Sequence, residues 1–468
     1  MQDLMQKIVS LAKRRGFIFQ ASEIYGGVEA LWDYGPLGAL LKNNIKREWL
    51  KCFVQERDDV VLVDGTVIMH PKTWEASGHL ESFTDPLVEC KSCHKRYRAD
   101  QLVVELPPGT DLGPTNRPFA VPGTIKKVYP HEKCQNCGGE LTNPKNFNLM
   151  FKTFLGPVEN EASVAYLRPE TAQTMFEDFK LVQESQRLKL PFGIAQIGRC
   201  FRNEITTGNF IFRSREFDIA EIEYFVKPEE DEEAFNKWLD AWEQFFIYLG
   251  LKKENLRRYE HPKESLAHYS KRTVDIEYHF PFGWAELAGV ANRTDFDLSQ
   301  HAKFSGQDLR YFDDEIKERY FPYVIEPTLG IERLLLALLA DSYEEVKGGR
   351  TTTTEAAKEE ETVLRLNKKI APIQVAVLPL LKNNKELVAR AKEIYEALKP
   401  HFMCQYDEVG TIGRRYRRQD EIGTPACITV DHQTLQDNTV TLRDRDTMSQ
   451  ERVSAERLPQ AIDKLLKE

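Results

Sequence analysis

The segment CFRNEITTGNFIFRSREF, residues 200–217, restricts the fold of this chain more than any other stretch. It predicts a β-hairpin, because the Gly and Asn of its central TTGN, residues 206–209, are typical turn residues. Side chains two positions apart on a strand share a face, so Arg202 and Glu204 are expected to point the same way. The return strand would place a mixed set of side chains on one face: Arg213, Arg215, Phe217, Ile219, Glu221 and Glu223.

This charged face has two interpretations. It could be a solvated edge with cross-strand ion pairs, since charge runs usually lie on a surface. It could also hold a nucleotide, because guanidinium groups bind phosphate oxygens through paired hydrogen bonds and Phe offers a flat apolar face to a base. The segment EPTLGIER adds Gly330 at a predicted strand–helix junction and Arg333 in the first helical turn, with Glu326 and Glu332 nearby. By itself this segment could be an ordinary helix cap.

Four of the eight cysteines form two CxxC pairs, Cys90 with Cys93 and Cys134 with Cys137. Two such pairs can bind one Zn²⁺ in a tetrahedral site, although the spacer between them is longer than usual. They lie within residues 86–145, a Pro- and Gly-rich module. Because this module has little hydrophobic core of its own, it needs a stabilising cross-link such as a bound metal ion. The alternatives are four reduced cysteines without metal, or replacement of a cysteine ligand by His94 or His131.

Length and charge limit the class of protein. The 468 residues correspond to about three domains. A net charge of −9 argues against indiscriminate nucleic-acid binding but allows a local basic patch. No apolar run approaches the roughly 20 residues that a membrane span needs, and the N-terminal segment predicts an amphipathic helix rather than a signal peptide. We therefore expect a cytoplasmic enzyme without a membrane partner.

Periodicity divides the chain into five parts. A helix beginning at Pro36 is expected to bury one face, which carries Leu37, Leu41, Ile45, Trp49 and Phe53. After residue 368, strands alternate with helices around an Arg-rich turn, which predicts a compact α/β domain. The parts are residues 1–85 and 146–343 of one main domain with a helical insertion near 227–270, the inserted module 86–145, a charged linker 344–368, and a C-terminal domain 369–468.

Three of these segments, in order, resemble the motifs of class II aminoacyl-tRNA synthetases. The stretch from Gly35 to Pro71 resembles the first motif, which forms the dimer interface in that class. Phe201-Arg202-Asn203-Glu204 with Arg213-x-x-x-Phe217 resembles the second, and Gly330-x-Glu332-Arg333 the third. Further stretches are similar to the homodimeric glycyl-tRNA synthetase family over essentially the whole chain: FIFQASEIYGG, DYGPLGALLKNNIKREW, MHPKTWEASGH, LRPETAQ, REFDIAEIEYF, WAELAGVANRTDFDL and EPTLGIER.

The resemblance implies that the charged face holds ATP. Arg202 would bind the α-phosphate, Glu204 would accept from the adenine amino group, and Phe217 would stack on adenine. Arg213 and Arg333 would hold the γ-phosphate. Glu286 would help to bind Mg²⁺, as carboxylates beside substrate phosphates do. The other implied ATP-site residues are Asn203, Phe212, Leu287 and Gly330.

The resemblance also implies a glycine site. Glu170, Glu221 and Glu326 would surround the ammonium group, and three carboxylates on one face would repel one another without a cation between them. Arg98 would approach the glycine carboxylate, and Thr328 would offer a hydroxyl beside Cα. A tight site excludes larger amino acids by steric overlap, so no editing domain is expected. Two departures affect this site: Thr328 stands where family members commonly carry Ser, and Ile219-Ala220 where bacterial members often carry Gln-Met.

The C-terminal domain resembles the anticodon-binding domain of several class II members. Its GRRYRRQDE segment places four arginines around one tyrosine: Arg414, Arg415, Tyr416, Arg417 and Arg418. Basic residues interleaved with an aromatic suit unpaired bases and their phosphates. The same segment could be a solvated loop.

Together these features predict an α+β protein: an antiparallel sheet flanked by helices, with an inserted zinc-ribbon-like module and a C-terminal α/β anticodon-binding domain. The expected activity is glycine–tRNA ligation by a homodimer, with ATP, glycine and tRNA(Gly) as substrates, Mg²⁺, and one structural Zn²⁺. A non-catalytic relative is disfavoured because Arg202, Glu204, Arg213 and Arg333 are all present. The three glutamates disfavour a synthetase for serine, threonine or proline, and a pure zinc-ribbon nucleic-acid-binding protein would not need the ATP residues.

Overall fold

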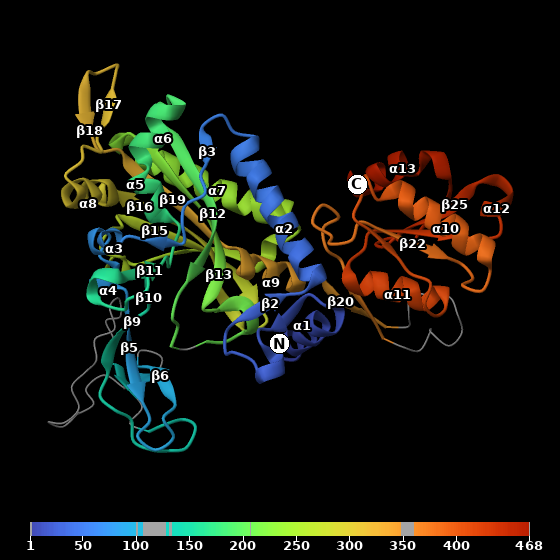
Figure 1. The fold of residues 1–468 in the computed structure, drawn as a ribbon, viewed down its shortest axis with the longest axis horizontal. Coiled ribbons are helices and arrows are strands. Elements are labelled where there is room, and N and C mark those ends of the chain that lie inside the picture. The colour runs from blue at the N-terminus through green and yellow to red at the C-terminus, as the bar shows by residue number, and fades with distance from the viewer. Residues whose placement is uncertain are drawn as a thin grey trace.

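The computed structural model describes residues 2–99, 102–105, 128–130, 133–205, 207–347 and 360–467 (Figure 1). Its largest sheet has seven strands, and each is antiparallel to its neighbours except β3, which runs parallel to β12. In spatial order they are β14 (Leu256–Glu260), β15 (Arg272–Phe280), β16 (Gly283–Thr294), β19 (Tyr323–Gly330), β13 (Glu216–Val226), β12 (Phe192–Phe201) and β3 (Val60–Leu62). An antiparallel sheet with helices packed on it confirms the predicted α+β class.

Helices cover both faces of this sheet. One face packs against α1 (Gln2–Arg15), α2 (Pro36–Leu50), α7 (Asp231–Tyr248) and α9 (Ile331–Ser342) in a single large core. The other face packs against α5 (Ala172–Glu177), α6 (Phe179–Gln186) and α8 (Phe296–Ser305). Because side chains alternate along β13, Ile222 and Tyr224 join the first core, whereas Phe225 joins the second.

The helix predicted from Pro36 is confirmed. Leu41, Ile45, Trp49 and Phe53 are all buried, and the helix continues into a π-helical turn at Lys51–Gln55. The N-terminal helix α1 ends in basic residues before Gly16, whose positive φ of 75° terminates it.

The hairpin at residues 200–217 exists, but its strands are shorter than predicted. Strand β12 ends at Phe201 and β13 begins at Glu216, and a short 3₁₀ helix, Phe210–Phe212, lies between them. Of the predicted turn residues, Thr206 lies outside the described residues. The prediction that Arg213 and Arg215 extend the face of the return strand was wrong, because both precede β13 in this loop. Arg215 instead donates to the backbone oxygens of Glu29 (3.0 Å) and Glu204 (3.2 and 3.3 Å).

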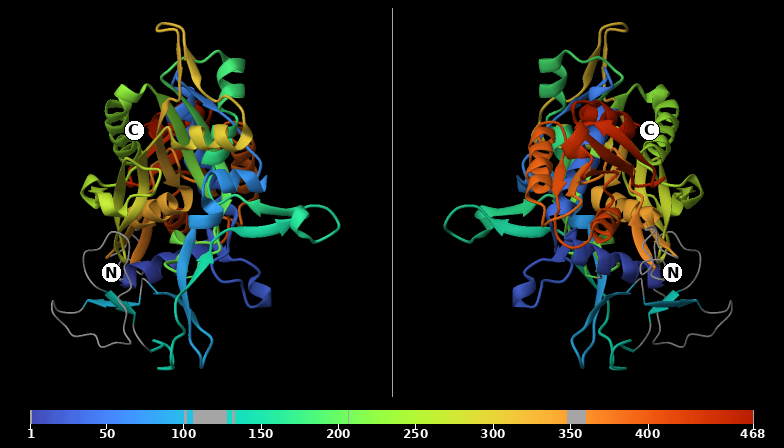
Figure 2. Two further views of the ribbon diagram at one scale, coloured as in Figure 1. Left: turned by 90° about the vertical axis from the view of Figure 1, so that its left-hand side faces the viewer. Right: turned by 90° about the vertical axis from the view of Figure 1, so that its right-hand side faces the viewer.

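Smaller elements surround the large sheet. The inserted module contains a sheet of β6 (Arg96–Arg98), β5 (Thr84–Glu89) and β9 (Lys145–Asn148), and a pair of β7 (Val103–Glu105) with β8 (Val128–Pro130). Strands β10 (Phe151–Phe154) and β11 (Val164–Leu167) form a hairpin that projects from the molecule and pairs with β4 (Ile68–Met69) (Figure 2). The remaining short elements are β1 (Ile18–Gln20), β2 (Trp32–Tyr34), α3 (Pro71–Ala76), α4 (His79–Ser82), β17 (Tyr311–Asp313) and β18 (Glu318–Tyr320).

The C-terminal domain has a five-stranded sheet in the order β23 (Cys404–Tyr406), β22 (Val375–Pro379), β24 (Ala426–Val430), β25 (Thr439–Asp444) and β26 (Gln450–Ser454). Helices α10 (Lys385–Leu398) and α13 (Leu458–Lys467) pack on one face, and α11 (Ile412–Ile422) packs on the other. The short helix α12 (Thr434–Asp437) precedes β25. The prediction of an Arg-rich turn in this domain was wrong. Thr411 caps the N-terminus of α11, and the arginines lie in that helix.

Part of the predicted linker forms a pair of strands. Strand β20 (Tyr343–Val346) pairs with β21 (Glu361–Leu364), and residues 348–359 lie outside the described residues. Within the part of the chain that the structure describes, no helix is long and apolar enough to cross a membrane.

Candidate active site

A pocket lies on the large sheet between the hairpin loop and the start of α9. It gathers most of the residues predicted to bind ATP. Its lining consists of Arg202, Glu204, Ile211, Phe212, Arg213, Ser214, Phe217, Ile219, Glu286, Thr328, Gly330, Glu332 and Arg333. These residues come from β13, β16, β19, α9 and the loop before β13, so the pocket forms only when the strands pair.

One side of the pocket carries the aromatic ring of Phe217 and a carboxylate oxygen of Glu204 that has no hydrogen-bond donor among the described residues. The Phe217 ring, on β13, lies 5.5 Å from the guanidinium carbon of Arg202, whose Nε donates to the Pro169 backbone oxygen (3.1 Å). Oε2 of Glu204 is buried and accepts no hydrogen bond from any described residue. A buried carboxylate oxygen without a donor is costly, so a ligand N–H at this point would be favoured.

The opposite side carries the second cationic group. Arg333 stands in the first turn of α9 and pairs with the carboxylate of Glu286 across the pocket (2.9 Å). Its guanidinium carbon also lies 4.5 Å from the ring centre of Phe212. The nearby Arg333 charge holds the pKa of the Glu286 carboxyl below its usual value. Glu286 is half exposed, so its carboxylate can reach a ligand in the pocket.

Two predicted ATP-site residues lie elsewhere. Leu287 follows Glu286 on β16, and its side chain points to the opposite face, where it is buried in the core beneath α9. A place in the ATP site stays a prediction for Leu287. Asn203 lies in the loop after β12, where its backbone N–H donates to the Leu149 backbone oxygen (2.8 Å).

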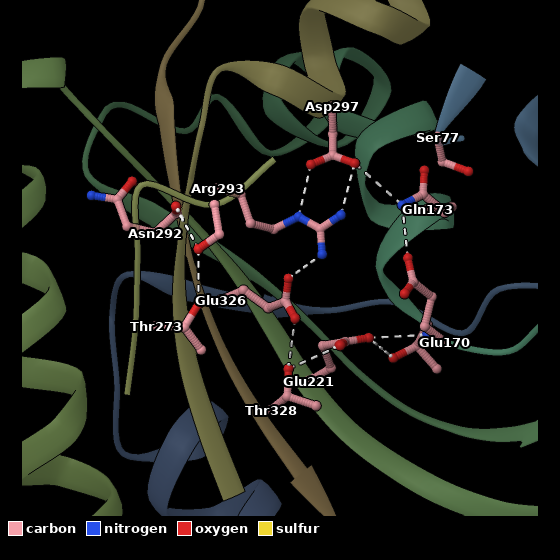
Figure 3. A network of polar contacts seen from close by, with 12 residues as sticks. Ser77, Glu170, Gln173, Glu221, Thr273, Asn292, Arg293, Asp297, Glu326 and Thr328 are labelled. Atoms are coloured by element: carbon pink, nitrogen blue, oxygen red, sulfur yellow. Dashed lines mark hydrogen bonds and ion pairs between the residues drawn. The ribbon is translucent and has the colours of Figure 1, made fainter. Parts of the chain in front are cut away.

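A cluster of carboxylates adjoins the pocket on the same face of the sheet (Figure 3). Glu221 lies four residues beyond Phe217 on β13 and pairs in register with Thr328 of β19. Its carboxylate accepts from the Thr171 backbone N–H (3.0 Å) and from the Thr328 hydroxyl (2.9 Å). Glu326, also on β19, lies 3.0 Å from the same hydroxyl.

Glu170, the third predicted glutamate, has partners of its own. One carboxylate oxygen lies 3.2 Å from Nε2 of His79, and the other accepts from Gln173 (2.8 Å). Burial opposes ionisation of Glu170, but the charge and hydrogen bond of His79 outweigh it and hold the pKa of the carboxyl well below its usual range. The structure thus places Glu170 beside Glu221 with partners for both of its carboxylate oxygens.

The sequence interpretation missed Arg293, which neutralises part of this cluster. Its guanidinium is 1% exposed, donates to both oxygens of Asp297 (2.7 and 2.9 Å) and pairs with Glu326. The only sequence signal was an Arg four residues before an Asp, which is common in helices and loops alike. Arg293 supplies a protein cation where the sequence predicted a substrate cation alone.

Glu223 is a second residue that the glycine-site prediction left out. It is fully buried, and neither of its carboxylate oxygens has a hydrogen-bond partner among the described residues. One ligand oxygen each from Glu221, Glu223 and Glu326 lie within 4.8 Å of one another. Burial, and then the charge of Glu326, raise the pKa of Glu223 well above its usual range. Burial likewise raises the pKa of Glu326 to about 8, although Arg293 opposes this shift.

Arg98, predicted to approach the glycine carboxylate, lies on β6 of the inserted module. Its guanidinium pairs with Asp85 at 2.8 Å. A place beside glycine stays a prediction for this residue.

The four CxxC cysteines converge on one point in the inserted module. Sγ of Cys90 lies 3.5 Å from that of Cys137, and Sγ of Cys93 lies 3.6 Å from that of Cys134. A tetrahedral Zn²⁺ with bonds of about 2.3 Å separates its sulfur ligands by about 3.8 Å, so the donor set fits zinc. Backbone N–H groups point at Cys90 and Cys134 (3.4 Å each), and the Tyr97 hydroxyl lowers the pKa of Cys134 to about 6. These contacts favour the thiolate forms of Cys90 and Cys134.

The residues predicted to meet the anticodon do not share one exposed surface. Arg415 and Tyr416 are buried against the sheet: Arg415 bonds the backbone oxygens of Pro379 and Gly410, and the Tyr416 hydroxyl bonds Thr429. The prediction that these two side chains contact bases was wrong, because packing of α11 encloses them. Arg417 pairs with Glu361 and Arg418 with Asp407, whereas Arg414 is exposed.

Comparisons with known proteins agree with this arrangement. The family model for the "tRNA synthetase class II core domain (G, H, P, S and T)" matches residues 154–342, and the "Anticodon binding domain" model matches residues 374–465. Two solved prolyl-tRNA synthetases, from Giardia lamblia with prolyl-adenylate and from Cryptosporidium parvum, have the same fold. Their TM-scores are 0.65 and 0.63 at 15% and 14% identity, over 99% and 98% of this chain and 79% and 76% of theirs.

Curated sequences give a narrower match. The chain is 50% identical to the glycine–tRNA ligase of Thermobifida fusca over 98% of its length and 97% of that protein. It is 53% identical to that of Streptomyces coelicolor over 97% of each chain. Identity at this level over nearly the full length is decisive: the chain belongs to the glycine–tRNA ligase family of class II aminoacyl-tRNA synthetases.

Proposed function

We propose that this protein couples glycine to the 3′ end of tRNA(Gly) in two steps at the pocket on its large sheet. In the first, a glycine carboxylate oxygen attacks the α-phosphorus of ATP, and pyrophosphate leaves. In the second, the terminal ribose hydroxyl of the tRNA attacks the glycyl carbonyl, and AMP leaves. The observation that carries the proposal is the continuous face of β13, where Phe217 belongs to the nucleotide pocket and Glu221 to the carboxylate cluster.

The nucleotide half binds and orients ATP. Arg202 would hold the α-phosphate, Phe217 would stack on adenine, and the unpaired oxygen of Glu204 would accept from the adenine amino group. Arg213 and Arg333 would hold the γ-phosphate. No side chain needs to act as a nucleophile, because catalysis here consists of positioning and charge stabilisation.

The glycine half selects by charge and size. Glu221 and Glu326 would hold the ammonium group, with the Thr328 hydroxyl between them and Glu170 behind. Arg98 would meet the carboxylate if the inserted module approaches the sheet. The positive charge of Arg293 reduces the repulsion among the carboxylates when no substrate is bound. Amino acids larger than glycine would be excluded by steric overlap with the residues of this site, and glycine has no smaller competitor.

Two metal ions fit residues of this chain. Mg²⁺, when bound, neutralises phosphate charge, and Glu286 at the pocket would hold it. Zn²⁺ would be held by Cys90, Cys93, Cys134 and Cys137, where four sulfur ligands leave no open position, so its role is structural.

We further propose a homodimer built on the segment from Gly35 to Pro71, which resembles the class II dimer motif. The C-terminal domain would bind the tRNA anticodon, with Arg414 as the exposed cation of α11. Because tRNA charging serves translation, we expect the enzyme in the cytoplasm.

The test is amino-acid-dependent ATP–pyrophosphate exchange with Mg²⁺ and no tRNA, measured for all twenty amino acids. Exchange with glycine alone is expected. Exchange with a different amino acid would keep the adenylation chemistry and reject glycine as the substrate. Folded protein that binds ATP but exchanges with no amino acid would instead indicate a non-catalytic relative.

A further inference from the structure

Three buried charged residues meet beside the nucleotide pocket, and one of them, Glu332, also lines it. They are Lys42 of α2, Asp218 of β13 and Glu332 of α9, whose side chains are 7%, 2% and 4% exposed. Nζ of Lys42 lies 3.0 Å from Oδ2 of Asp218 and also pairs with Oε1 of Glu332. One lysine therefore joins the helix of the first motif to the strand of the second and the helix of the third.

The two acids are joined through the backbone as well. The Asp218 N–H donates to Oε2 of Glu332 (2.9 Å), so Glu332 uses one oxygen for Lys42 and the other for β13. Lys46 and Arg199 also pair with Asp218. The charges of Lys42 and Lys46 outweigh burial and hold the pKa of the Asp218 carboxyl well below its usual range. Asp218 is thus held as a carboxylate among three cationic side chains.

The neighbours of these acids in the chain are pocket residues. Phe217 precedes Asp218 and faces the pocket, while Asp218 faces the helices, because adjacent strand residues point to opposite sides. Arg333 follows Glu332 at the start of α9 and lines the same pocket. A shift of Asp218 or Glu332 must therefore move Phe217 or Arg333.

The Lys42 side chain is only 7% exposed, so water offers it few partners in place of these contacts. Its ammonium group lies 4.3 Å from the ring centre of Tyr34, and the Tyr34 hydroxyl is itself buried without a partner among the described residues. Removal of one partner from a buried ion pair leaves the others uncompensated. Without Lys42, Glu332 would lose its ion-pair partner, whereas Asp218 would keep Lys46 and Arg199. Of these contacts, only the bond from the Asp218 N–H to Glu332 would then join α9 to β13 at this point.

From this geometry we propose that Lys42 is a positioning residue for the nucleotide site: it ties α9 to β13 so that Arg333 and Phe217 face each other across the pocket. The inference rests on the proposed ATP-dependent activity. It assigns to Lys42 no contact with substrate.

The experiment compares Lys42→Met, Lys42→Arg and Lys227→Met with the wild type. Lys227 is a matched control, because its Nζ pairs with the buried Asp313 (3.2 Å) just beyond the other end of β13. Glycine-dependent exchange is measured with ATP and glycine varied separately. ATP binding is measured by calorimetry, and folding by circular dichroism.

Lys42→Met is expected to raise the KM and Kd for ATP at least tenfold with the KM for glycine changed less than twofold. Lys42→Arg should recover part of this loss, and Lys227→Met should leave both KM values unchanged. A folded Lys42→Met protein with unchanged ATP affinity, or with equal rises in both KM values, would overturn the inference.

Two further outcomes, a variant that does not fold and a wild type without activity, have different meanings. If Lys42→Met does not fold, Asp218→Asn tests the same connection, because Lys42 keeps Glu332 as its partner; unchanged ATP affinity in that variant would also overturn the inference. If the wild type shows no exchange with glycine, the proposed function fails, and the calorimetric comparison still decides the role of Lys42.

Discussion

The Thr328 hydroxyl donates a 2.9 Å hydrogen bond to Oε1 of Glu221. The same hydroxyl lies 3.0 Å from Oε1 of Glu326. A hydroxyl has one proton to give, so both contacts are hydrogen bonds only if one of the two carboxyl groups carries a proton and donates it to Thr328. This agrees with the raised pKa of Glu326, about 8, which burial causes. We therefore expect Glu326 to be the carboxyl group that carries this proton near pH 7.

We predict that glycine binding strengthens as pH rises from 7 to 9. Below pH 8 the ammonium group must displace a proton from Glu326, which costs binding free energy, whereas above it the carboxylate is already ionised. The KM for glycine in pyrophosphate exchange should fall across this range while the KM for ATP stays level. In Glu326→Gln the KM for glycine should be higher and the pH slope lost; a slope that persists in this variant would assign the titration to a different group.

Thr328→Val should weaken glycine binding about tenfold. The substitution keeps the shape and removes the hydroxyl, and a hydrogen bond to a charged group contributes about 1.5 kcal/mol or more. Thr328→Ser is the control, since it retains the hydroxyl and should stay within twofold of the wild type. Equal KM values for glycine in the Val and Ser variants would show that the hydroxyl does not matter.

Arg333→Lys should lower kcat for exchange roughly 100-fold, as expected when a charge-stabilising donor is lost. Lysine keeps the charge but loses the planar fork that bonds phosphate through two N–H groups. Arg310→Lys is the control, because Arg310 pairs with Asp308 (2.8 Å) and neither residue lines the pocket. The idea fails if both variants lose activity to the same extent.

Purified protein should contain one zinc ion per chain, measured by atomic emission. Cys134→Ser should lose it, because the Cys134 sulfur is one of four converging ligands. Cys404→Ser, which alters a cysteine in the C-terminal domain, should keep it. Wild-type protein without zinc, after growth in zinc-supplemented medium, would support four reduced cysteines.

Substitutions in α11 should separate tRNA binding from stability. Arg414→Ala should raise the KM for tRNA severalfold and leave pyrophosphate exchange unchanged, since Arg414 is exposed. Tyr416→Phe should lower the free energy of unfolding of the C-terminal domain by about 1 kcal/mol through loss of the bond to Thr429, with little effect on the KM for tRNA. The opposite pattern would restore Tyr416 as a tRNA contact.

Local sequence was enough for several features. The 3.6-residue spacing of Leu41, Ile45 and Trp49 determined the buried face of α2, because helical periodicity depends only on neighbours in the chain. The two CxxC pairs predicted one site with four sulfur ligands, and the four sulfur atoms do converge. The order of the three motifs predicted an ATP pocket that the paired strands then assembled from Arg202, Phe217 and Arg333.

Only the tertiary structure decided where side chains of similar chemistry point. Arg213 lines the pocket while Arg215 turns away to backbone oxygens of Glu29 and Glu204, because both lie in the loop before β13, where strand alternation does not apply. Tyr416 is buried because α11 packs on the sheet, which an Arg-rich string cannot reveal. Arg293 meets Glu326, and Lys42 meets Glu332, across 33 and 290 residues of chain. Such pairs depend on which strands and helices become neighbours, and pattern within a short segment carries no information about that.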